Sequence, residues 1–263
     1  MKIGFVEERH RRIMRELEMK NKVSVSDLSS KLNVTPETIR SDLRRLEERN
    51  KLRRIHGGAI CYYGLMKEQQ FNKKISISLP SKKKIGEAAA SFISDGDTVV
   101  LDVGSTTIHI AGSIENTENV TIITNSLAAA EIINTRIENK LFNGKVILIG
   151  GTVDPLQRST SGSITNQMLE QFYFDKAFIS CGGMNPEGIC DYNIDEAAAS
   201  AIMVKRSKQV FVVADSSKLN QRAFFNISPF SAIDFVITDA DMPTDWPKEE
   251  IKFNGLKWLK VHT

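Results

Sequence analysis

Arginine side chains are concentrated in one short part of this 263-residue sequence. The 25 residues from 35 to 59, TPETIRSDLRRLEERNKLRRIHGGA, contain six arginines and one lysine. Guanidinium groups form paired hydrogen bonds with phosphate oxygens and with the edge of guanine, so this composition offers recognition of a nucleic acid. The same composition also fits a solvated helix surface, and the spacing of the residues decides between the two.

The positive charge of the chain is confined to its N-terminal part. Residues 1–60 hold 15 Lys and Arg against 9 Asp and Glu, a balance of +6, whereas the rest of the chain holds 20 against 23, a balance of −3. A positive field that is local to one segment is typical of a segment that alone meets a polyanion.

The spacing of apolar residues in this part predicts three short helices. Each helix has an inward pair four positions apart, the separation that places two side chains on one helix face. These pairs are Ile13 with Leu17, Leu28 with Leu32, and Ile39 with Leu43. Ser24 is a candidate N-cap of the second helix, and Thr35 can cap the third. Pro36 then stands at the first helical position, where its missing N–H costs nothing.

The third helix is expected to turn Ile39, Leu43 and Leu46 toward the other two helices. Two helices joined by a short turn, the second basic on its free face, are typical of a helix-turn-helix, whose second helix enters the major groove. The early turns of that helix supply the candidate base readers Glu37, Thr38, Ser41 and Arg44. The candidate phosphate contacts, which position the protein without reading sequence, are Arg40, Arg45, Arg53 and Arg54.

Residues 50–59, NKLRRIHGGA, have the pattern of a strand that ends in a tight turn at Gly57 and Gly58. A strand and turn directly after a recognition helix indicate the wing of a winged helix-turn-helix. His56 belongs to this wing, where contact with a DNA phosphate and simple packing are both open.

Residues 23–59, VSVSDLSSKLNVTPETIRSDLRRLEERNKLRRIHGGA, resemble the DeoR family of bacterial transcriptional regulators in composition, order and the HGGA tail. The family's TIRRDL appears here as TIRSDL, with Ser41 where arginine is usual. Asn50 replaces a common helix-ending glycine, and asparagine also tolerates the left-handed conformation. The resemblance implies binding to double-stranded operator DNA, and Ser41 bears on which operator is read.

The rest of the chain predicts a second domain of the α/β class, with residues 1–60 as the first domain, 61–79 as a connection and 80–263 as the second. From Asp97 onward, short β-branched runs alternate with helical patterns, which indicates a mainly parallel sheet. The closing segment WPKEEIKFNGLKWLKVHT is expected to add an edge strand.

Five loops that follow the predicted strands are rich in Gly, Ser, Thr and Asn: 102–107, 124–126, 150–152, 181–183 and 214–218. Parallel sheets bind ligands at the carboxyl ends of their strands, where these loops lie. In DVGSTT, Gly104 permits close approach of the backbone to a phosphate and the hydroxyl groups that follow can bind it, although a plain capped turn is the alternative for this loop alone. The convergence of five such loops, one ending in Lys218, favours a binding site. The chain contains neither a G-x-x-x-x-G-K-[ST] loop nor a G-x-G-x-x-G after a strand, so no nucleotide cofactor is expected.

The resemblance to DeoR regulators continues through LDVGSTT, TNS, ILIGG, FDKAFISCGG, GICDYNIDEAAASAIMVKRS and VVADSSK, and so covers nearly the whole chain. It implies an effector domain similar in fold to ribose-5-phosphate isomerase that senses a phosphorylated sugar. The loops and the resemblance together give these candidate effector-binding residues: Asp102, Gly104, Ser105, Thr106, Thr107, Thr124, Asn125, Gly151, Asp175, Gly182, Glu196, Lys205, Asp215 and Lys218.

Several other classes of protein are not indicated. Cys61, Cys181 and Cys190 have no metal-binding or redox spacing and are odd in number, which indicates reduced thiols in a cytoplasm. No apolar run of about 18 residues occurs, and the N-terminus lacks the apolar core of a signal peptide. We therefore expect a cytoplasmic protein with no membrane contact, no metal and no cofactor.

The expected function is a transcriptional regulator, most simply a repressor acting as a homodimer or homotetramer, whose operator binding is gated by a phosphorylated sugar. The alternative is a sugar-phosphate isomerase with an accessory DNA-binding domain. An isomerase needs a general base near a substrate carbon, and Glu196 with Lys205 is the candidate pair for it. An isomerase assay on sugar phosphates separates the two hypotheses.

Overall fold

The structure is a computed structural model that describes residues 5–20, 22–49, 51–61, 70–247 and 255–262. The chain divides into two compact units, residues 1–67 and 68–263. The finer limits that the sequence suggests, 1–60, 61–79 and 80–263, stay predictions. Asn50, the expected helix-ending residue, lies outside the described residues.

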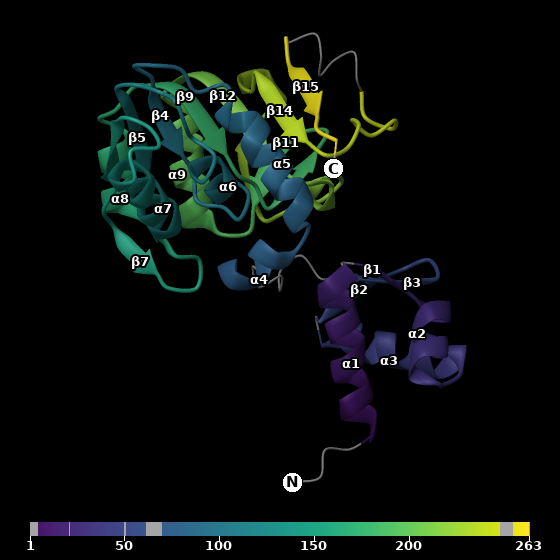
Figure 1. Ribbon diagram of the computed structural model, residues 1–263. Coiled ribbons are helices and arrows are strands. Elements are labelled where there is room, and N and C mark those ends of the chain that lie inside the picture. The colour runs from purple at the N-terminus through teal and green to yellow at the C-terminus, as the bar shows by residue number, and fades with distance from the viewer. Residues whose placement is uncertain (1–4, 21, 50, 62–69, 248–254, 263) are drawn as a thin grey trace. The chain divides into compact units, whose positions relative to one another are not determined.

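The first unit is a three-helix domain with a small antiparallel sheet (Figure 1). Its elements are α1 (Phe5–Lys20), β1 (Lys22–Ser24), α2 (Val25–Leu32), α3 (Pro36–Glu48), β2 (Leu52–Ile55) and β3 (Gly58–Cys61). The strand order is β1-β3-β2, and the turn between β2 and β3 is the wing that the sequence predicts. The expected caps are confirmed, because the Ser24 hydroxyl accepts from the Asp27 N–H and the Thr35 hydroxyl accepts from the Thr38 N–H.

A single apolar core holds the first unit together. It contains the three inward pairs expected from the sequence, of which Ile13, Leu17 and Ile39 are fully buried. Gly58 is required where β3 pairs with β1, because a Cβ atom there would lie 2.0 Å from the carbonyl oxygen of Val23. The wing is therefore held close against the start of α2.

The second unit is a three-layer α/β domain (Figure 1). Its helices are α4 (Phe71–Ser76), α5 (Leu79–Ala90), α6 (Thr107–Ala111), α7 (Leu127–Glu138), α8 (Ser163–Leu169) and α9 (Ile194–Lys205). The strands of its main sheet are β4 (Thr98–Leu101), β5 (Val120–Thr124), β6 (Gly144–Leu148), β9 (Phe174–Ile179), β12 (Ser207–Val213), β14 (Phe235–Thr238) and β15 (Lys257–Lys260).

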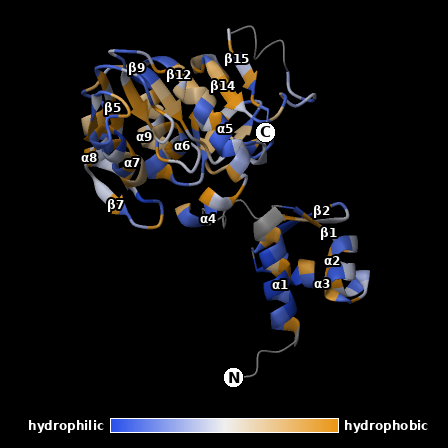
Figure 2. Ribbon diagram, in the orientation of Figure 1, coloured by the Kyte–Doolittle hydropathy of each residue, from blue (hydrophilic) through white to orange (hydrophobic). Residues whose placement is uncertain are grey.

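All seven strands of the main sheet pair in parallel, in the order β15-β14-β12-β9-β4-β5-β6, which confirms the predicted fold class. The C-terminal strand β15 is an edge strand, as expected. The central strands appear mostly orange in Figure 2 because both of their faces are buried. Side chains alternate between two cores, so that Val99 and Leu101 face the core under α5 to α7, while Val100 faces the core under α8 and α9.

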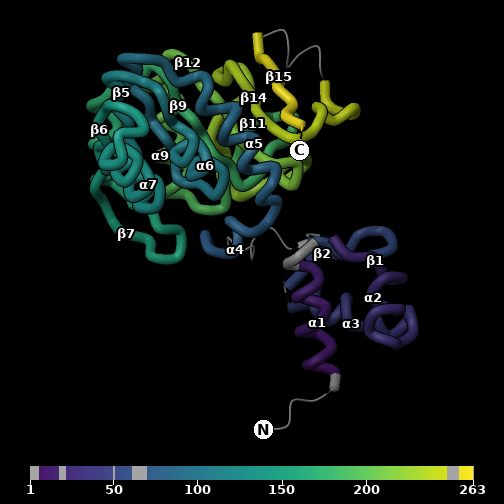
Figure 3. The backbone as a smooth tube through the Cα atoms, in the orientation of Figure 1, coloured from purple at the N-terminus to yellow at the C-terminus, as the bar shows by residue number. Residues whose placement is uncertain are grey.

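Two smaller strand groups were not predicted from the sequence. The hairpin β7 (Thr152–Asp154) with β8 (Ser159–Ser161) follows β6, and Figure 3 shows it as a loop that extends from the sheet near α4. A separate antiparallel sheet contains β10 (Gly183–Asn185), β11 (Gly188–Asp191) and β13 (Phe225–Ser228). Within the described ranges of the chain, no helix is long and apolar enough to cross a membrane.

Candidate functional site

The first candidate surface is the free face of α3. Its inner face is buried through Ile39, Leu43 and Leu46, in agreement with the predicted stripe. The outer face is exposed and contains most of the predicted DNA contacts: Glu37, Arg40, Ser41, Arg44 and Arg45. Thr38 is half-buried, and its hydroxyl lies 2.9 Å from that of Thr35 in the N-cap. The structure thus places the predicted base readers along one helix, from its first turn to Arg44.

The arginines predicted to contact DNA differ in their partners. Arg44, Arg45 and Arg53 have no ion-pair partner among the residues that the structure describes. Arg40 donates to Glu37 over 2.7 Å on the exposed face, a contact that contributes little in water and is easily exchanged for a phosphate. The Arg54 guanidinium lies 3.7 Å from Glu47, a carboxylate that also accepts from the Arg54 backbone N–H over 2.8 Å. Arg54 therefore also ties the wing to α3.

The wing turn contains His56, whose side chain is exposed. The next residue, Gly57, has a φ of +77°, a conformation that glycine adopts without strain. Its carbonyl oxygen accepts from the Val25 N–H over 2.8 Å, which anchors the wing to the first turn of α2. His56 is thus presented to solvent rather than packed, which leaves it available to a phosphate.

A buried ion cluster that the sequence did not suggest fixes α3 against α1. Asp42 is 2% exposed and accepts from the Arg9 Nε over 2.5 Å, from the Arg9 Nη2 over 3.1 Å and from the His10 Nε2 over 2.9 Å. Burial alone would raise the pKa of Asp42, but the bonds from Arg9 and His10 together lower that pKa below its usual value. Asp42 belongs to the TIRSDL motif, yet its partners lie 33 and 32 positions away in the sequence.

The second candidate site is the carboxyl edge of the main sheet. The chain order of the strands reverses between β4 and β9, which is the topological switch point where open parallel sheets bind ligands. Asp102 follows β4 at this point and is 1% exposed. Its carboxylate accepts from the Val103 N–H over 2.8 Å, from the Ser180 N–H over 3.3 Å and from the Ser200 hydroxyl over 2.8 Å. Burial raises the pKa of Asp102 to about 7, although the bond from Ser200 opposes this shift.

The hydroxyl groups of the DVGSTT loop are of two kinds: one is bonded within the fold, and two are available to a ligand. The Thr107 hydroxyl donates to the backbone oxygen of Asp102 over 2.7 Å and is fully buried, so it closes the loop on itself. Ser105 and Thr106 are buried, and their hydroxyls make no hydrogen bond within the described part of the chain. At Gly104 a Cβ atom would lie 2.4 Å from the Ser180 Oγ, so glycine permits the close approach of the two loops across the switch point.

The loops after β5 and β6 contribute further polar groups. Thr124 is structural, because its hydroxyl donates to the Leu101 oxygen over 2.7 Å. Asn125 is fully buried, and its Oδ1 has no hydrogen-bond partner among the described residues. Glu196, at the start of α9, is buried and accepts from the Ser159 hydroxyl over 2.8 Å. Gly151 has a φ of +152° and packs against Thr165.

The loops after β9 and β12 complete this edge. Gly182 lies against the ring of Tyr192, and a Cβ atom there would be 2.8 Å from it. Asp215 is 1% exposed; its Oδ1 accepts from the Ser217 N–H over 3.0 Å, and its Oδ2 has no hydrogen-bond partner among the described residues. Lys218 is half-buried and has no ion-pair partner in the same described part of the chain.

Sequence reasoning missed two charged residues at this edge. Lys82 of α5 is 2% exposed, with its Nζ 3.8 Å from the Asp215 Oδ2. Asp191, at the end of β11, has its pKa raised by burial, while the positive charges of Lys74 and Lys218 partly oppose that shift. Nothing local in the sequence marks either residue, because both reach the edge from outside the loops that follow the parallel strands.

Asp175 and Lys205, two predicted effector residues, lie at the other end of the sheet. Asp175 is at the start of β9, where its carboxylate accepts from the Lys208 Nζ over 2.7 Å and from the Thr98 N–H over 2.9 Å. The bond from Lys208 is the main reason that the pKa of Asp175 is lowered. Lys205 ends α9 and is exposed. Neither residue is brought together with the other predicted effector residues.

The same geometry separates the candidate pair of the isomerase hypothesis. Glu196 and Lys205 lie in the first and last turns of α9. At 1.5 Å per residue the separation along the helix is about 13 Å, too far for one base and one acid to act on the same substrate carbon.

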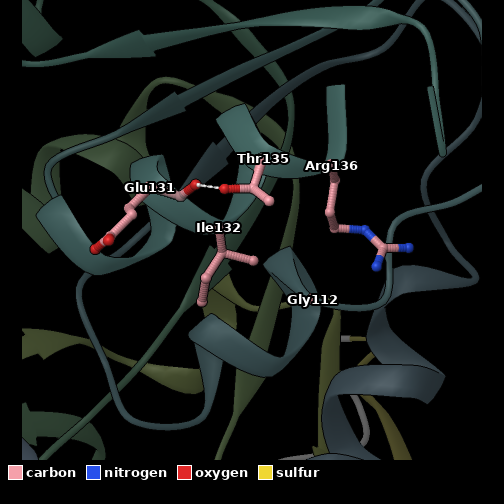
Figure 4. A pocket seen from close by; sticks show the side chains of 5 residues that line it. All are labelled: Gly112, Glu131, Ile132, Thr135 and Arg136. Atoms are coloured by element: carbon pink, nitrogen blue, oxygen red, sulfur yellow. Dashed lines mark hydrogen bonds between the residues drawn. The ribbon is translucent and has the colours of Figure 1, made fainter. Parts of the chain in front are cut away.

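Two surface hollows lie away from the polar edge. Figure 4 shows one, between the end of α6 and α7, where the Thr135 hydroxyl donates to the backbone oxygen of Glu131. Its lining residues are Gly112, Glu131, Ile132, Thr135 and Arg136. The other contains Lys205 and is formed with Glu170, Gln171, Ile202 and Arg206. Neither combines a free cation with buried carboxylates, as the sheet edge does.

Comparison with known protein families gives two matches, one for each unit. Residues 9–62 match the family described as the DeoR-like helix-turn-helix domain, and residues 78–240 match the family described as the DeoR C terminal sensor domain. The first match covers α2, α3 and the wing. The second covers the sheet edge and every predicted effector residue.

Similar proteins are transcriptional regulators by name. An uncharacterized HTH-type transcriptional regulator of Staphylococcus epidermidis is 38% identical over 80% of this chain and 83% of its own length. The HTH-type transcriptional repressor GlcR of Bacillus subtilis is 32% identical over 97% of this chain and 96% of its own. The lactose phosphotransferase system repressor of Staphylococcus epidermidis is 33% identical over 82% and 85%.

Among solved structures, a D-ribose-5-phosphate isomerase in complex with phospho-erythronic acid is similar to part of the chain. The TM-score is 0.38, with 18% identity over 52% of each chain. A TM-score this low carries no inference about function.

Proposed function

The chain belongs to the DeoR family of HTH-type transcriptional regulators, and from this premise we propose that it is a repressor of a sugar-metabolism operon. It reads double-stranded operator DNA with α3 and the wing. A phosphorylated sugar, bound at the carboxyl edge of the parallel sheet, sets its affinity for that DNA. The protein acts in the cytoplasm as a homodimer or homotetramer.

The observation that carries the DNA-reading role is the exposed basic face of α3. Arg44 projects from the face opposite the buried stripe, without a partner in the described residues, and can pair in bidentate fashion with a guanine. Arg45 and Arg53 likewise have no partner in the described residues and can bind phosphates. A helix in the major groove and a wing against the backbone need cations in this distribution.

The chemistry of the sheet edge supports a phosphorylated sugar as the effector. Lys218 supplies a half-buried positive charge with no partner among the described residues, which suits a phosphate. The unsatisfied oxygens of Asp215 and Asn125 can accept hydrogen bonds from sugar hydroxyls. Ser105 and Thr106 offer hydroxyls that the fold itself leaves unbonded within its described part. A ligand with both an anionic group and several hydroxyls satisfies all of these groups at once.

The first test identifies both partners. Duplexes selected from a randomised DNA library by the full-length protein should converge on one sequence, and that duplex is then used as the operator. Thermal shift against a panel of aldose and ketose phosphates should single out one ligand, since a ligand at 100 times its Kd stabilises the folded protein by about 2.7 kcal/mol. Failure of the selection to converge would refute the DNA-reading role. An absence of any shift would refute the sugar-phosphate effector.

A spectrophotometric isomerase assay on the sugar phosphates that bind provides the control. The proposal requires binding without turnover. Turnover that is lost on changing Glu196 to Gln would instead support the isomerase alternative.

A further inference from the structure

Lys82 is buried, whereas the two lysines that follow it in the sequence are exposed. The sequence KKK at 82–84 places three adjacent ammonium groups within α5. Lys83 and Lys84 are exposed, and Lys84 pairs with Glu87 over 2.8 Å. Lys82, in contrast, is 2% exposed. Removal of an ammonium group from water is costly unless partners replace the water, so the partners of Lys82 are informative.

The Lys82 ammonium group joins two separate parts of the second unit. Its Nζ donates to the backbone oxygen of Lys74 in α4 over 2.5 Å. The same atom lies 3.8 Å from the Asp215 Oδ2, which has no hydrogen bond among the described residues. Burial lowers the pKa of Lys82 to about 8, and the attraction of Asp215 opposes this shift, while Lys218 and Lys74 add to it. The lysine is thus held between the backbone of α4 and the polar sheet edge.

Helix α4 lies at the start of the described part of the second unit. It is the first described element of the second unit, directly after residues 62–69, which follow the wing in sequence. At its N-terminal end Phe71 is 1% exposed, packs with Ile108 and Ala128, and donates its N–H to the Leu156 oxygen over 3.0 Å. At its C-terminal end the Lys74 oxygen accepts from the Ile77 N–H over 3.3 Å and from Lys82. Lys82 therefore ties this end of α4 to the sheet edge.

We propose that Lys82 is a positioning residue that couples the effector site to α4, and through α4 to the segment that carries the DNA-binding unit. The inference rests on the proposed function. An anion bound beside Lys218 attracts the Lys82 ammonium, because a charge-assisted bond to a phosphate is stronger than a bond to a neutral carbonyl. Lys82 then leaves the Lys74 oxygen, and the C-terminal end of α4 is released. Effector binding and the release of α4 are then linked, so that each favours the other, as coupling between two sites requires.

The test compares Lys82→Met with the matched control Lys83→Met in the full-length protein. Methionine keeps the length of the side chain but removes its charge and its N–H donors. The probe is the sugar phosphate that gives the largest thermal shift with the wild type, used at a concentration that saturates each variant. Operator affinity is measured with and without it by fluorescence anisotropy.

We expect the wild type and Lys83→Met to bind the operator equally, within threefold, in the absence of the sugar phosphate. Lys82→Met lacks the bond to the Lys74 oxygen from the start, so without the ligand its operator Kd should already match that of the ligand-saturated wild type. Saturating sugar phosphate should change the operator Kd of the wild type and of Lys83→Met by the same factor. It should change that of Lys82→Met by less than twofold, although the ligand still binds. A wild-type response in Lys82→Met overturns the inference and leaves the proposed function intact. If no sugar phosphate changes the wild-type operator Kd, the proposed function fails and the inference falls with it.

A second measurement needs no substitution and covers the case in which Lys82→Met does not fold. Hydrogen exchange is followed in the wild-type peptide that spans residues 71–78, with and without the same sugar phosphate. Release of the Lys74 oxygen should speed exchange of the α4 amides at least fivefold on ligand binding. Unchanged or slower exchange in α4 would overturn the inference.

Discussion

The charged side chains of the two units differ in their exposure to solvent. On α3 and β2, Arg44, Arg45 and Arg53 are exposed and without partners among the described residues. At the sheet edge, by contrast, Asp102 and Asp215 are each 1% exposed. Exposed cations lose little hydration when they meet a polyanion. They therefore bind the phosphates of DNA whatever its base sequence, and this binding weakens as the salt concentration rises. Buried charges are costly to desolvate and suit a ligand that matches all of them.

Buried charged side chains also occur inside the DNA-reading unit. Asp42 is buried there, and it holds Arg9 and His10 of α1 against the helix that carries the base readers. The Asp42 cluster thus orients a helix whose other face is exposed to water. Substitution of single residues tests whether the exposed and buried charges have these separate roles.

The largest expected effect is that of Asp42→Asn. Loss of the carboxylate leaves the partly buried Arg9 without its partner, and removal of one member of a buried pair costs about 3 kcal/mol of unfolding free energy. Hydrogen exchange of the α1 and α3 amides should show this loss in the first unit only. Glu48→Gln, on the exposed face of the same helix, is the control and should change the unfolding free energy by less than about 0.5 kcal/mol.

The pH dependence of the unfolding free energy that these amides report sharpens this test. Folding lowers the pKa of Asp42 from 3.8, so its contribution is present above that value and is lost as the pH falls through the folded-state pKa. The wild-type first unit should lose stability on acidification below about pH 4, and Asp42→Asn should lose less. Parallel pH profiles in the two proteins would show that the ion cluster does not stabilise the unit.

Lys218→Ala should show the next largest effect, and only at the sheet edge. Loss of one charge-assisted contact to a phosphate costs about 1.5–3 kcal/mol, which weakens sugar-phosphate binding roughly 10- to 150-fold. Operator affinity without the effector should be unchanged, because Lys218 lies in the other unit. Calorimetry with the sugar phosphate and anisotropy with the operator check both statements. A variant that still responds to the effector like the wild type would place the anion site elsewhere.

Arg44→Ala should weaken operator binding by relaxing sequence preference. A bidentate contact to guanine is worth about 1–3 kcal/mol at one base pair, so discrimination at that position should fall while other positions keep theirs. Binding to operators with single base changes measures this directly. Equal weakening on random DNA would make Arg44 a phosphate contact.

Arg53→Ala should give the smallest change. Loss of one phosphate contact reduces the slope of log affinity against log salt by about one unit and leaves sequence preference intact. Titration of the operator over a range of salt concentrations measures the slope. An unchanged slope would mean that the wing does not contact DNA.

The features of the fold that could be predicted from the sequence are those that a few neighbouring residues determine. Thr35 and Pro36 mark the start of α3, and the run VTIIT marks a buried strand, because caps and β-branched runs act over a few residues. The sequence could not reveal Asp42 as the centre of an ion cluster, since Arg9 is 33 positions away. Lys82 resembled its solvated neighbours, and only the packing of α5 against the sheet edge distinguishes it.

The candidate effector residues show the same limit. Loops that follow parallel strands meet at one edge by topology alone, so Gly104 and Asn125 were placed correctly at that edge. Asp175 and Lys205 were taken from resemblance, and their positions at a strand start and a helix end put them at the opposite edge. Their assignment to the effector stays a prediction, and the geometry does not favour it.

The central claim is that one sugar phosphate and the operator are linked through this chain. The most direct test measures that linkage in both directions on the wild type. Operator affinity is titrated with and without the sugar phosphate, and sugar-phosphate affinity is titrated with and without the operator. Linkage requires the two factors to be equal, and a repressor released by its effector requires both to be a loss of affinity. A sugar phosphate that binds at the sheet edge yet leaves operator affinity unchanged would contradict the account.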